Sequence, residues 1–285
     1  MLLSYTRAYL EEAEEVAANT GDVEKILAVL RKLGLDDYGL FLISLPNSQY
    51  PAISKLLPRM ASEEVSTSWT GSHGTELLKQ TLAFTRILEN SVVRYMNRTL
   101  HDCTVLDFGC GYGRFMRMMY YYISPENLWG VDAWDRSLQT SRDAGILGNL
   151  VQSERTPKEL PVAETTFDVA FAFSVFTHLA PPTAQACLGA VRRHMNEGGL
   201  FIPTIRPLEF WSFIDGIRQT NHASRLEVEH NSRGIAYLPH EGEEGKTYGD
   251  TSMGFDFLAT DEWRFLGYDR SIYDPYQISV ILQAR

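Results

Sequence analysis

The sequence predicts an α/β fold in which a mostly parallel β-sheet with crossover helices follows a helical N-terminal extension. From about Thr104 onward, short apolar runs alternate with amphipathic stretches, a pattern typical of parallel strands and their connecting helices. Before that point, apolar residues recur at helical spacing in residues 22–34 and again in 75–97. A glycine-rich turn at 109–113 then separates the first apolar run from a helical stretch.

The helical extension covers residues 1–97. Asp22 is a suitable N-cap for its clearest helix, and Gly34 is a suitable stop. A stretch rich in Pro and Ser, Pro46 to Trp69, follows, and a second long helix is expected over Thr75 to Asn97. These segments predict a cap of helices in front of the sheet.

The remaining residues, 98–285, form one domain in this interpretation. A crossover helix is expected to begin after Pro181-Pro182 and to stop at Gly198-Gly199. Residues 207–256 are rich in Gly, His, Asn and charge and have the character of an insertion. The expected strands are Thr104 to Phe108, Leu128 to Asp132, Asn149 to Gln152, Phe167 to Phe173, Leu200 to Ile205, Trp263 to Ile272 and Gln277 to Gln283.

Composition narrows the class of partner. The 285 residues carry a formal net charge of -10, which makes nucleic acid a poor partner. The 3 cysteines show no CxxC pairing, so we expect neither a disulfide framework nor a zinc ribbon, and a reducing cytoplasm fits best. No apolar run approaches the ~20 residues of a membrane helix, and no signal peptide is recognisable. The 7 histidines are scattered without HExxH, so no metal site is predicted.

The glycine-rich turn allows the backbone to approach a ligand closely, because glycine has no side chain and adopts unusual dihedral angles. A second strand ends at Asp132, whose carboxylate can accept both hydroxyls of a ribose. For a dinucleotide, however, the third glycine of the motif would fall at Arg114, and Asp107 before the turn would oppose an anionic pyrophosphate. A cationic ligand such as S-adenosylmethionine suits this turn better.

Four segments, in order, resemble the motifs of class I S-adenosylmethionine-dependent methyltransferases. Residues 105–114 (Val-Leu-Asp-Phe-Gly-Cys-Gly-Tyr-Gly-Arg) resemble motif I, and 129–132 (Trp-Gly-Val-Asp) resemble the second motif. Residues 167–179 resemble the fourth motif, and 195–201 resemble the segment that leads into the fifth strand. The resemblance implies a Rossmann-like sheet of seven strands that closes with an antiparallel hairpin, S-adenosylmethionine as cofactor and methyl transfer as activity.

The resemblance also implies roles for the matched positions. Asp107 and the turn would lie near the methionine moiety, and Asp132 would bind the ribose, while Asp135 would cap the next helix. Residues 133–134 would lie beside the adenine, with 153–154 near its amino group. The expected cofactor contacts are Trp69, Gly71, Asp107, Phe108, Gly109, Cys110, Gly111, Asp132, Ala133, Trp134, Ser153, Glu154, Phe173 and Ser174.

Three further features concern the acceptor. His178, just beyond the fourth strand, is the candidate general base, since imidazole titrates near neutrality; alternatively it orders the loop before Pro181-Pro182. Residues 69–74 are expected to form a lid over the cofactor, the alternative being a plain helix entry capped by Thr75. The insertion at 207–256 is expected to carry acceptor specificity.

Together these observations predict a methyltransferase that acts on a small-molecule or glycan-like acceptor at oxygen. The Asn/Asp-Pro-Pro-aromatic sequence of members that methylate amino groups of bases is replaced here by Phe173-Ser174-Val175-Phe176. Two alternatives remain at this level: an NAD-dependent oxidoreductase on the same kind of sheet, and a noncatalytic protein that binds S-adenosylmethionine.

Overall fold

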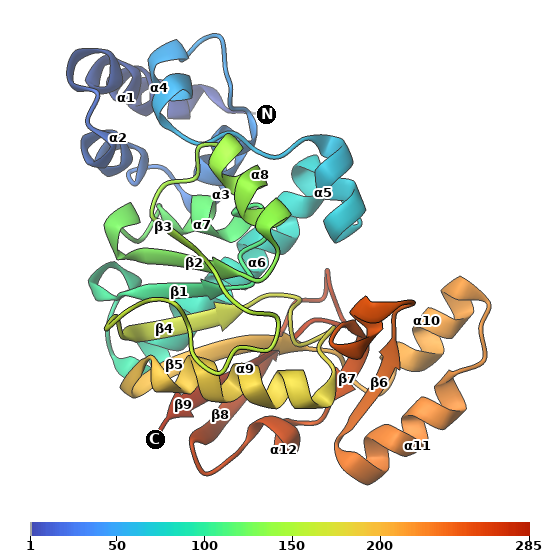
Figure 1. The fold of residues 1–285 in the computed structure, drawn as a ribbon. Coiled ribbons are helices and arrows are strands. Elements are labelled where there is room, and N and C mark those ends of the chain that lie inside the picture. The colour runs from blue at the N-terminus through green and yellow to red at the C-terminus, as the bar shows by residue number, and fades with distance from the viewer. Residues whose placement is uncertain (1) are drawn as a thin grey trace.

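A computed structural model describes residues 2–285 and contains the predicted sheet of seven strands, covered by helices on both faces (Figure 1). The strand order is β3-β2-β1-β4-β5-β9-β8, and β9 runs antiparallel to both of its neighbours. The predicted fold class is therefore confirmed. The strands are β1 Val105–Phe108, β2 Leu128–Asp132, β3 Asn149–Gln152, β4 Phe167–Ala172, β5 Met195–Ile205, β8 Trp263–Arg270 and β9 Ile278–Ala284.

The helices comprise an N-terminal group, crossover helices and helices of the insertion. They are α1 Arg7–Thr20, α2 Val23–Leu30, α3 Leu35–Ile43, α4 Pro51–Leu56, α5 Glu63–Thr70, α6 Gly74–Met96, α7 Arg114–Met119, α8 Asp135–Asp143, α9 Pro181–Arg193, α10 Phe210–Arg218, α11 Ala223–Arg233 and α12 Phe255–Leu258. Short 3₁₀ helices are η1 Ser4–Thr6, η2 Leu100–Asp102, η3 Pro125–Asn127 and η4 Glu243–Lys246. No helix among residues 2–285 is long and apolar enough to cross a membrane.

Several predicted boundaries in the N-terminal extension are wrong. The Asp22 side chain caps α2 as expected, but α2 ends at Leu30, and Gly34 is the N-cap of α3. The segment from Pro46 to Trp69 contains α4, with proline in its first turn, and α5, which Ser62 caps by accepting an N–H bond. Although its Pro and Ser content is typical of a loop, this segment therefore forms two short helices, each with a strong signal at its N-terminus.

Further boundaries also differ from the prediction. Helix α9 includes both prolines, beginning at Pro181, and ends at Arg193, while β5 starts at Met195 rather than at Leu200. The early start arises because Met195 pairs with Phe167 across a register shift in the β4–β5 ladder. Helix α6 begins at Gly74, with His73 at the N-cap, so Thr75 is not the cap.

Two hydrophobic clusters cover the two faces of the sheet, as the alternation of strand side chains requires. Val105 and Phe171 belong to one cluster, whereas their strand neighbours Leu106 and Ala170 belong to the other. Leu10, Ile26 and Phe41 of the N-terminal helices join the first cluster. The helical extension therefore shares its core with one face of the sheet.

The segment predicted as an insertion is an ordered unit. It contains α10, α11 and an antiparallel pair of strands, β6 Ile235–Pro239 and β7 Gly249–Met253, around a small cluster that includes Trp211. Figure 1 shows this unit beside the end of the sheet where β4 and β5 terminate. An isolated bridge between Leu179 and Tyr248 joins it to the loop after β4.

Candidate active site

The glycine-rich turn lies where the strand order reverses, because β1 pairs with β2 on one side and with β4 on the other. The amides of Gly109 and Cys110 both donate to the carbonyl oxygen of Val131, at 2.7 and 3.1 Å. Gly109 has φ of 79°, and a Cβ placed there would be 2.3 Å from Cγ2 of Val175. Only glycine therefore allows the loops after β1 and β4 to meet at this distance.

Asp132, at the end of β2, holds two loops together. One carboxylate oxygen accepts the amide of Gly111 and the other accepts the amide of Trp134, each at 2.8 Å. Burial raises the pKa of this carboxyl, while the bonds from backbone amides act in the opposite direction. The expectation that Asp135 caps α8 is wrong: Trp134 occupies the N-cap position, and Asp135 is the first helical residue. Asp132 therefore connects the glycine-rich turn to the loop that follows β2.

Asp107 is buried in β1, with 1% of its surface exposed. Its Oδ2 atom has no hydrogen-bond partner among the described residues. Burial, and then the negative charge of Asp132, raise the pKa of the Asp107 carboxyl well above its ordinary value, and Arg114 lowers it only in part. A nearby cationic group would stabilise the charged form of this carboxyl, so the position beneath the turn favours a cationic ligand.

A cavity of about 330 Å³ opens above the turn, a volume within the range of small-molecule sites. Most of the predicted cofactor residues line it: Trp69, Phe108, Gly109, Gly111, Asp132, Ala133, Trp134, Ser153, Glu154, Phe173 and Ser174. The structure brings these side chains together from four strand ends and from α5.

Three predicted contacts do not line the cavity. Asp107 lies in β1 below the turn, and Gly71 follows the end of α5 as its left-handed C-cap. The sulfur of Cys110 faces β2, where a Cβ at Gly130 would approach it to 3.0 Å. Trp69 does line the cavity, but from the last turn of α5 rather than from a loop, with its ring centroid 5.7 Å from that of Tyr112.

The cavity also has walls that the sequence did not predict. Val175 and Leu179 fall within the segment that resembles the fourth motif, so the motif itself was a usable signal. Thr247 and Tyr248 come from the insertion, and no local pattern marks them. The remaining additional residues are Ser68, Val131, Ser137, Arg155 and Cys187.

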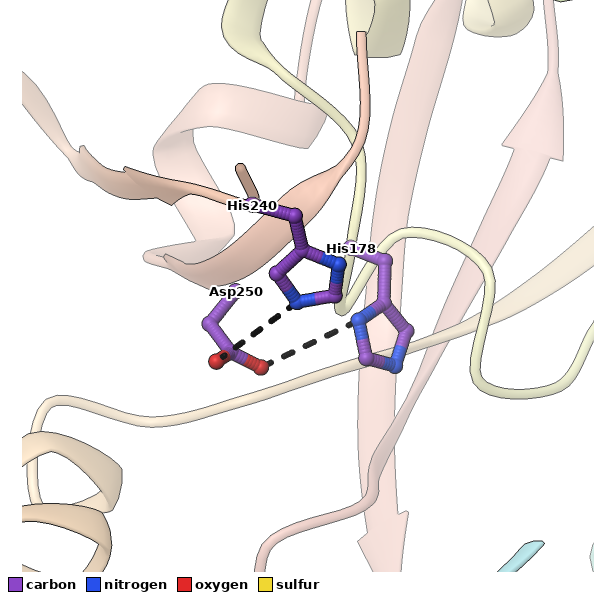
Figure 2. A group of neighbouring side chains, drawn as sticks. All are labelled: His178, His240 and Asp250. Carbon is purple, nitrogen blue, oxygen red and sulfur yellow. Dashed lines mark ion pairs between the residues drawn. The ribbon is translucent and has the colours of Figure 1, made fainter. Parts of the chain in front are cut away.

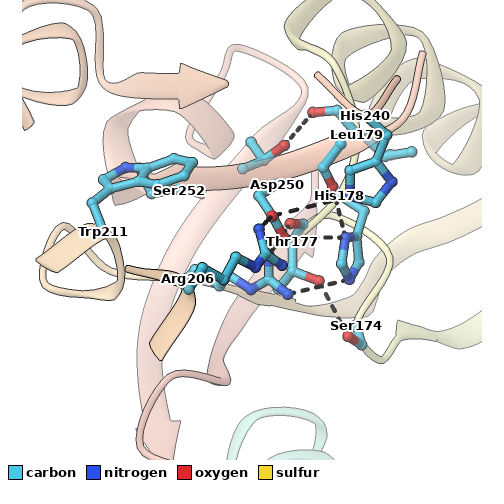
Figure 3. Close-up of polar contacts among 12 residues, drawn as sticks. Ser174, Thr177, His178, Leu179, Arg206, Trp211, His240, Asp250 and Ser252 are labelled. Atoms are coloured by element: carbon cyan, nitrogen blue, oxygen red, sulfur yellow. Dashed lines mark hydrogen bonds and ion pairs between the residues drawn. The ribbon is translucent and has the colours of Figure 1, made fainter. Parts of the chain in front are cut away.

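His178 does not line the cavity, and both of its ring nitrogens have partners (Figure 3). Nδ1 lies 2.7 Å from the carbonyl oxygen of Gly249, and Nε2 lies 3.3 Å from a guanidinium nitrogen of Arg206. Burial, and then the positive charge of Arg206, lower the pKa of His178 to about 3. Because the only lone pair of the neutral ring points at Arg206, this geometry supports the alternative of a loop-ordering histidine over a general base.

His178, His240 and Asp250 converge at the same place (Figure 2), with one ligand atom of each within 4.8 Å of the others. The two oxygens of Asp250 already pair with Arg206 and Arg218, each at 2.6 Å. Burial opposes ionisation of Asp250, but the guanidinium groups hold its pKa below the ordinary value. Two cations on the carboxylate would repel a metal ion, so the cluster is an ion-pair network.

A second polar chain lies beside Phe173. Arg114 donates to Oε1 of Gln80 at 2.6 Å, and Gln80 donates to Asp274 at 2.5 Å. The guanidinium of Arg114 also lies 5.0 Å from the ring centroid of Phe173. This chain ties the turn between β8 and β9 to α6 and α7.

Comparison with known proteins identifies the domain. The sequence profile of the family described as "Methyltransferase domain" matches residues 105–199, which contain the turn and β1 to β4. This match indicates a methyltransferase domain in that part of the chain. The chain is 28% identical over 120 residues to "Sterol methyltransferase-like 2" of Botryococcus braunii, a match that covers 41% of this chain and 30% of that protein. The match thus spans less than a third of the relative's length.

A solved structure supports the fold. The PH0226 protein of Pyrococcus horikoshii superimposes with a TM-score of 0.52 at 15% identity, over 78% of this chain and 97% of that one. Such a similarity concerns the arrangement of the sheet and its helices alone.

The residues around the cavity fit S-adenosylmethionine, the cofactor of this methyltransferase family. A Cβ at Gly111 would meet no atom within 4 Å, so the backbone there borders open space that a ligand can fill. Asp107 offers an unpaired oxygen below the turn for a cationic ligand, and Asp132 keeps further lone pairs for the ribose. Trp134, with 36% of its surface exposed, offers an aromatic surface for the adenine.

Proposed function

We propose that this protein transfers the methyl group of S-adenosylmethionine to the oxygen of a small-molecule or glycan-like acceptor. The observation that carries the proposal is the cavity above the turn, with the unpartnered Asp107 carboxylate beneath it and Asp132 in its wall. A cationic group bound above the turn would stabilise the ionised form of Asp107, so this position suits a sulfonium or an ammonium group and disfavours a pyrophosphate.

The cofactor supplies a methyl carbon that its sulfonium already activates for in-line displacement. The protein therefore needs mainly to orient the acceptor and to exclude water. In this chain, Trp69 of α5 covers one part of the cavity, and Phe173 and Ser174, which follow β4, line another. His178 is held by Gly249 and Arg206, so in our proposal the proton released from the acceptor hydroxyl on methylation passes to solvent water rather than to His178.

Ser174 is the best-placed polar side chain for contact with the acceptor. Its φ of 58° is unusual for a residue other than glycine. The strained backbone is held by a bond from its amide to Thr204 at 2.7 Å, and its hydroxyl accepts from Gln277 at 3.0 Å and lies 3.2 Å from that of Thr177. A hydroxyl so fixed at the cavity wall can orient an oxygen nucleophile.

The decisive experiment is a calorimetric titration of the purified protein with S-adenosylhomocysteine and, separately, with NAD. We expect binding of the first and none of the second, followed by methyl transfer to hydroxyl-bearing acceptors in a panel assayed by mass spectrometry. Binding of NAD alone would refute the proposal. Binding of S-adenosylhomocysteine without transfer to any acceptor would favour the noncatalytic alternative.

Ser174→Ala tests the acceptor side of the same proposal. The variant keeps Asp107, Asp132 and the glycine-rich turn, so its affinity for S-adenosylhomocysteine should fall much less than its kcat/KM for the acceptor. Its kcat/KM for the acceptor should fall by about tenfold, since one oriented hydrogen bond to the acceptor is lost. Unchanged kinetics would remove Ser174 from the acceptor site.

A further inference from the structure

We propose that the insertion completes the cofactor cavity: Tyr248 forms an aromatic wall at the adenine end, beside Trp134, and His178 is a positioning residue that supports it. The inference rests on the proposed use of S-adenosylmethionine. Tyr248 and Thr247 are the two residues of the insertion that line the cavity. The ring centroids of Tyr248 and Trp134 lie 5.4 Å apart at an interplanar angle of 52°.

The backbone fixes Tyr248 in this place. Residues 247–251 run alongside the loop after β4 and exchange hydrogen bonds with it over several residues. The amide of Ala180 donates to Thr247 at 3.0 Å, and the amide of Gly249 donates to the carbonyl oxygen of His178 at 2.8 Å. Because the same loop begins at the cavity-lining Ser174, the insertion and the methyltransferase sheet share this wall of the cavity.

His178 supports the Tyr248 ring by stacking on it. The two rings are stacked, with centroids 4.9 Å apart and planes inclined by 12°. The imidazole is itself held at both nitrogens, by Gly249 and by Arg206, and Arg206 is anchored in turn by Asp250 and by the carbonyl oxygen of Thr177, as Figure 3 shows for Arg206, Asp250 and His178.

In this arrangement His178, Arg206 and Asp250 hold an aromatic ring in place instead of transferring a proton. A ring clamped on one face by a fixed imidazole loses little further freedom when a ligand packs against it, so binding costs less entropy. The phenol oxygen of Tyr248 has no hydrogen-bond partner among the described residues, and therefore the aromatic ring is the part expected to matter. The ligand class that fits beside Trp134 and Tyr248 is a purine.

Titration with S-adenosylhomocysteine and with free adenosine tests the proposal. Tyr248→Ala should lower the affinity for both ligands by about tenfold, whereas the affinities of Tyr248→Phe, which keeps the ring, should stay within about twofold of the wild type. Tyr268→Ala is the matched control, because Tyr268 is 61% exposed on β8, and it should leave both affinities unchanged. A thermal melt of each variant checks that it is folded.

A double-mutant cycle separates support by His178 from an independent effect. If His178 acts through Tyr248, His178→Ala should weaken adenosine binding, and the double variant should bind no more weakly than Tyr248→Ala. Additive losses would overturn the supporting role of His178, and unchanged adenosine affinity in folded Tyr248→Ala would overturn the aromatic wall. A wild-type protein that binds no S-adenosylhomocysteine would instead overturn the proposed function.

Discussion

Replacement of Gly109 by alanine should destabilise the protein through backbone strain and through a steric contact with Val175. Alanine at φ of 79° costs about 1–2 kcal/mol, because its Cβ crowds the backbone in the left-handed region. The same Cβ would lie 2.3 Å from Cγ2 of Val175, and relief of such an overlap adds about 1–3 kcal/mol. We therefore expect Gly109→Ala to lower the free energy of unfolding by about 2–5 kcal/mol, measured by denaturant titration.

Two further variants isolate the steric part of this loss. Gly111→Ala shares the positive φ, at 57°, but its Cβ would meet nothing within 4 Å, so only the conformational cost of about 1–2 kcal/mol should appear. Val175→Ala removes Cγ1 and Cγ2, and the remaining Cβ lies at an ordinary 3.5 Å. The cost of Gly109→Ala should accordingly be smaller in a Val175→Ala background. Equal destabilisation by the two glycine substitutions, or no rescue by Val175→Ala, would refute the reasoning.

Two other predictions concern the ion-pair network. Since the pKa of His178 falls from its ordinary value to about 3 on folding, the unfolded chain binds more protons, and the free energy of unfolding should decrease as pH falls from about 6.5 towards 3. His178→Asn should make that decrease shallower in denaturant titrations; parallel curves would contradict the assignment. Arg206→Ala should lower the free energy of unfolding by about 3 kcal/mol, because it leaves the buried Asp250 with one fewer cation. Arg218 is 46% exposed, so Arg218→Ala should lower the free energy of unfolding by less than about 1 kcal/mol. Equal losses in thermal and chemical unfolding would contradict this ranking.

Much of the sheet could be predicted because its signals are local. Strand β1, the turn and β2 follow from apolar runs that end at Asp107-Phe108 and Asp132, and parallel strands place their carboxyl ends at one edge. The end of α2 could not be read correctly, because a glycine can end one helix or begin the next. At Gly34 the packing of α3 decides between the two. The end of α9 could not be read because Met195 already pairs with Phe167 in the sheet.

The residues of the cavity also differ in how far the sequence could predict them. Those next to a strand end, such as Gly111 and Asp132, belong to a recognisable motif and could be predicted. The cavity's other walls depend on segments that meet only in the folded chain: Trp69 lies on a short helix that reads as loop, and Tyr248 comes from an insertion without a recognisable pattern. The sequence also could not reveal the contacts of His178, because Gly249, whose carbonyl oxygen contacts Nδ1, is 71 positions away.

The sequence by itself determined the α/β fold class, the position of the glycine-rich turn and the charge that selects a cationic cofactor, because these depend on side-chain periodicity and on residues adjacent in the chain. The tertiary structure decided what surrounds that cofactor. It placed Tyr248 against His178 and Trp134 and gave both nitrogens of His178 to structural partners. Contacts of that kind are fixed by packing between distant elements, for which no short segment of sequence carries a signal.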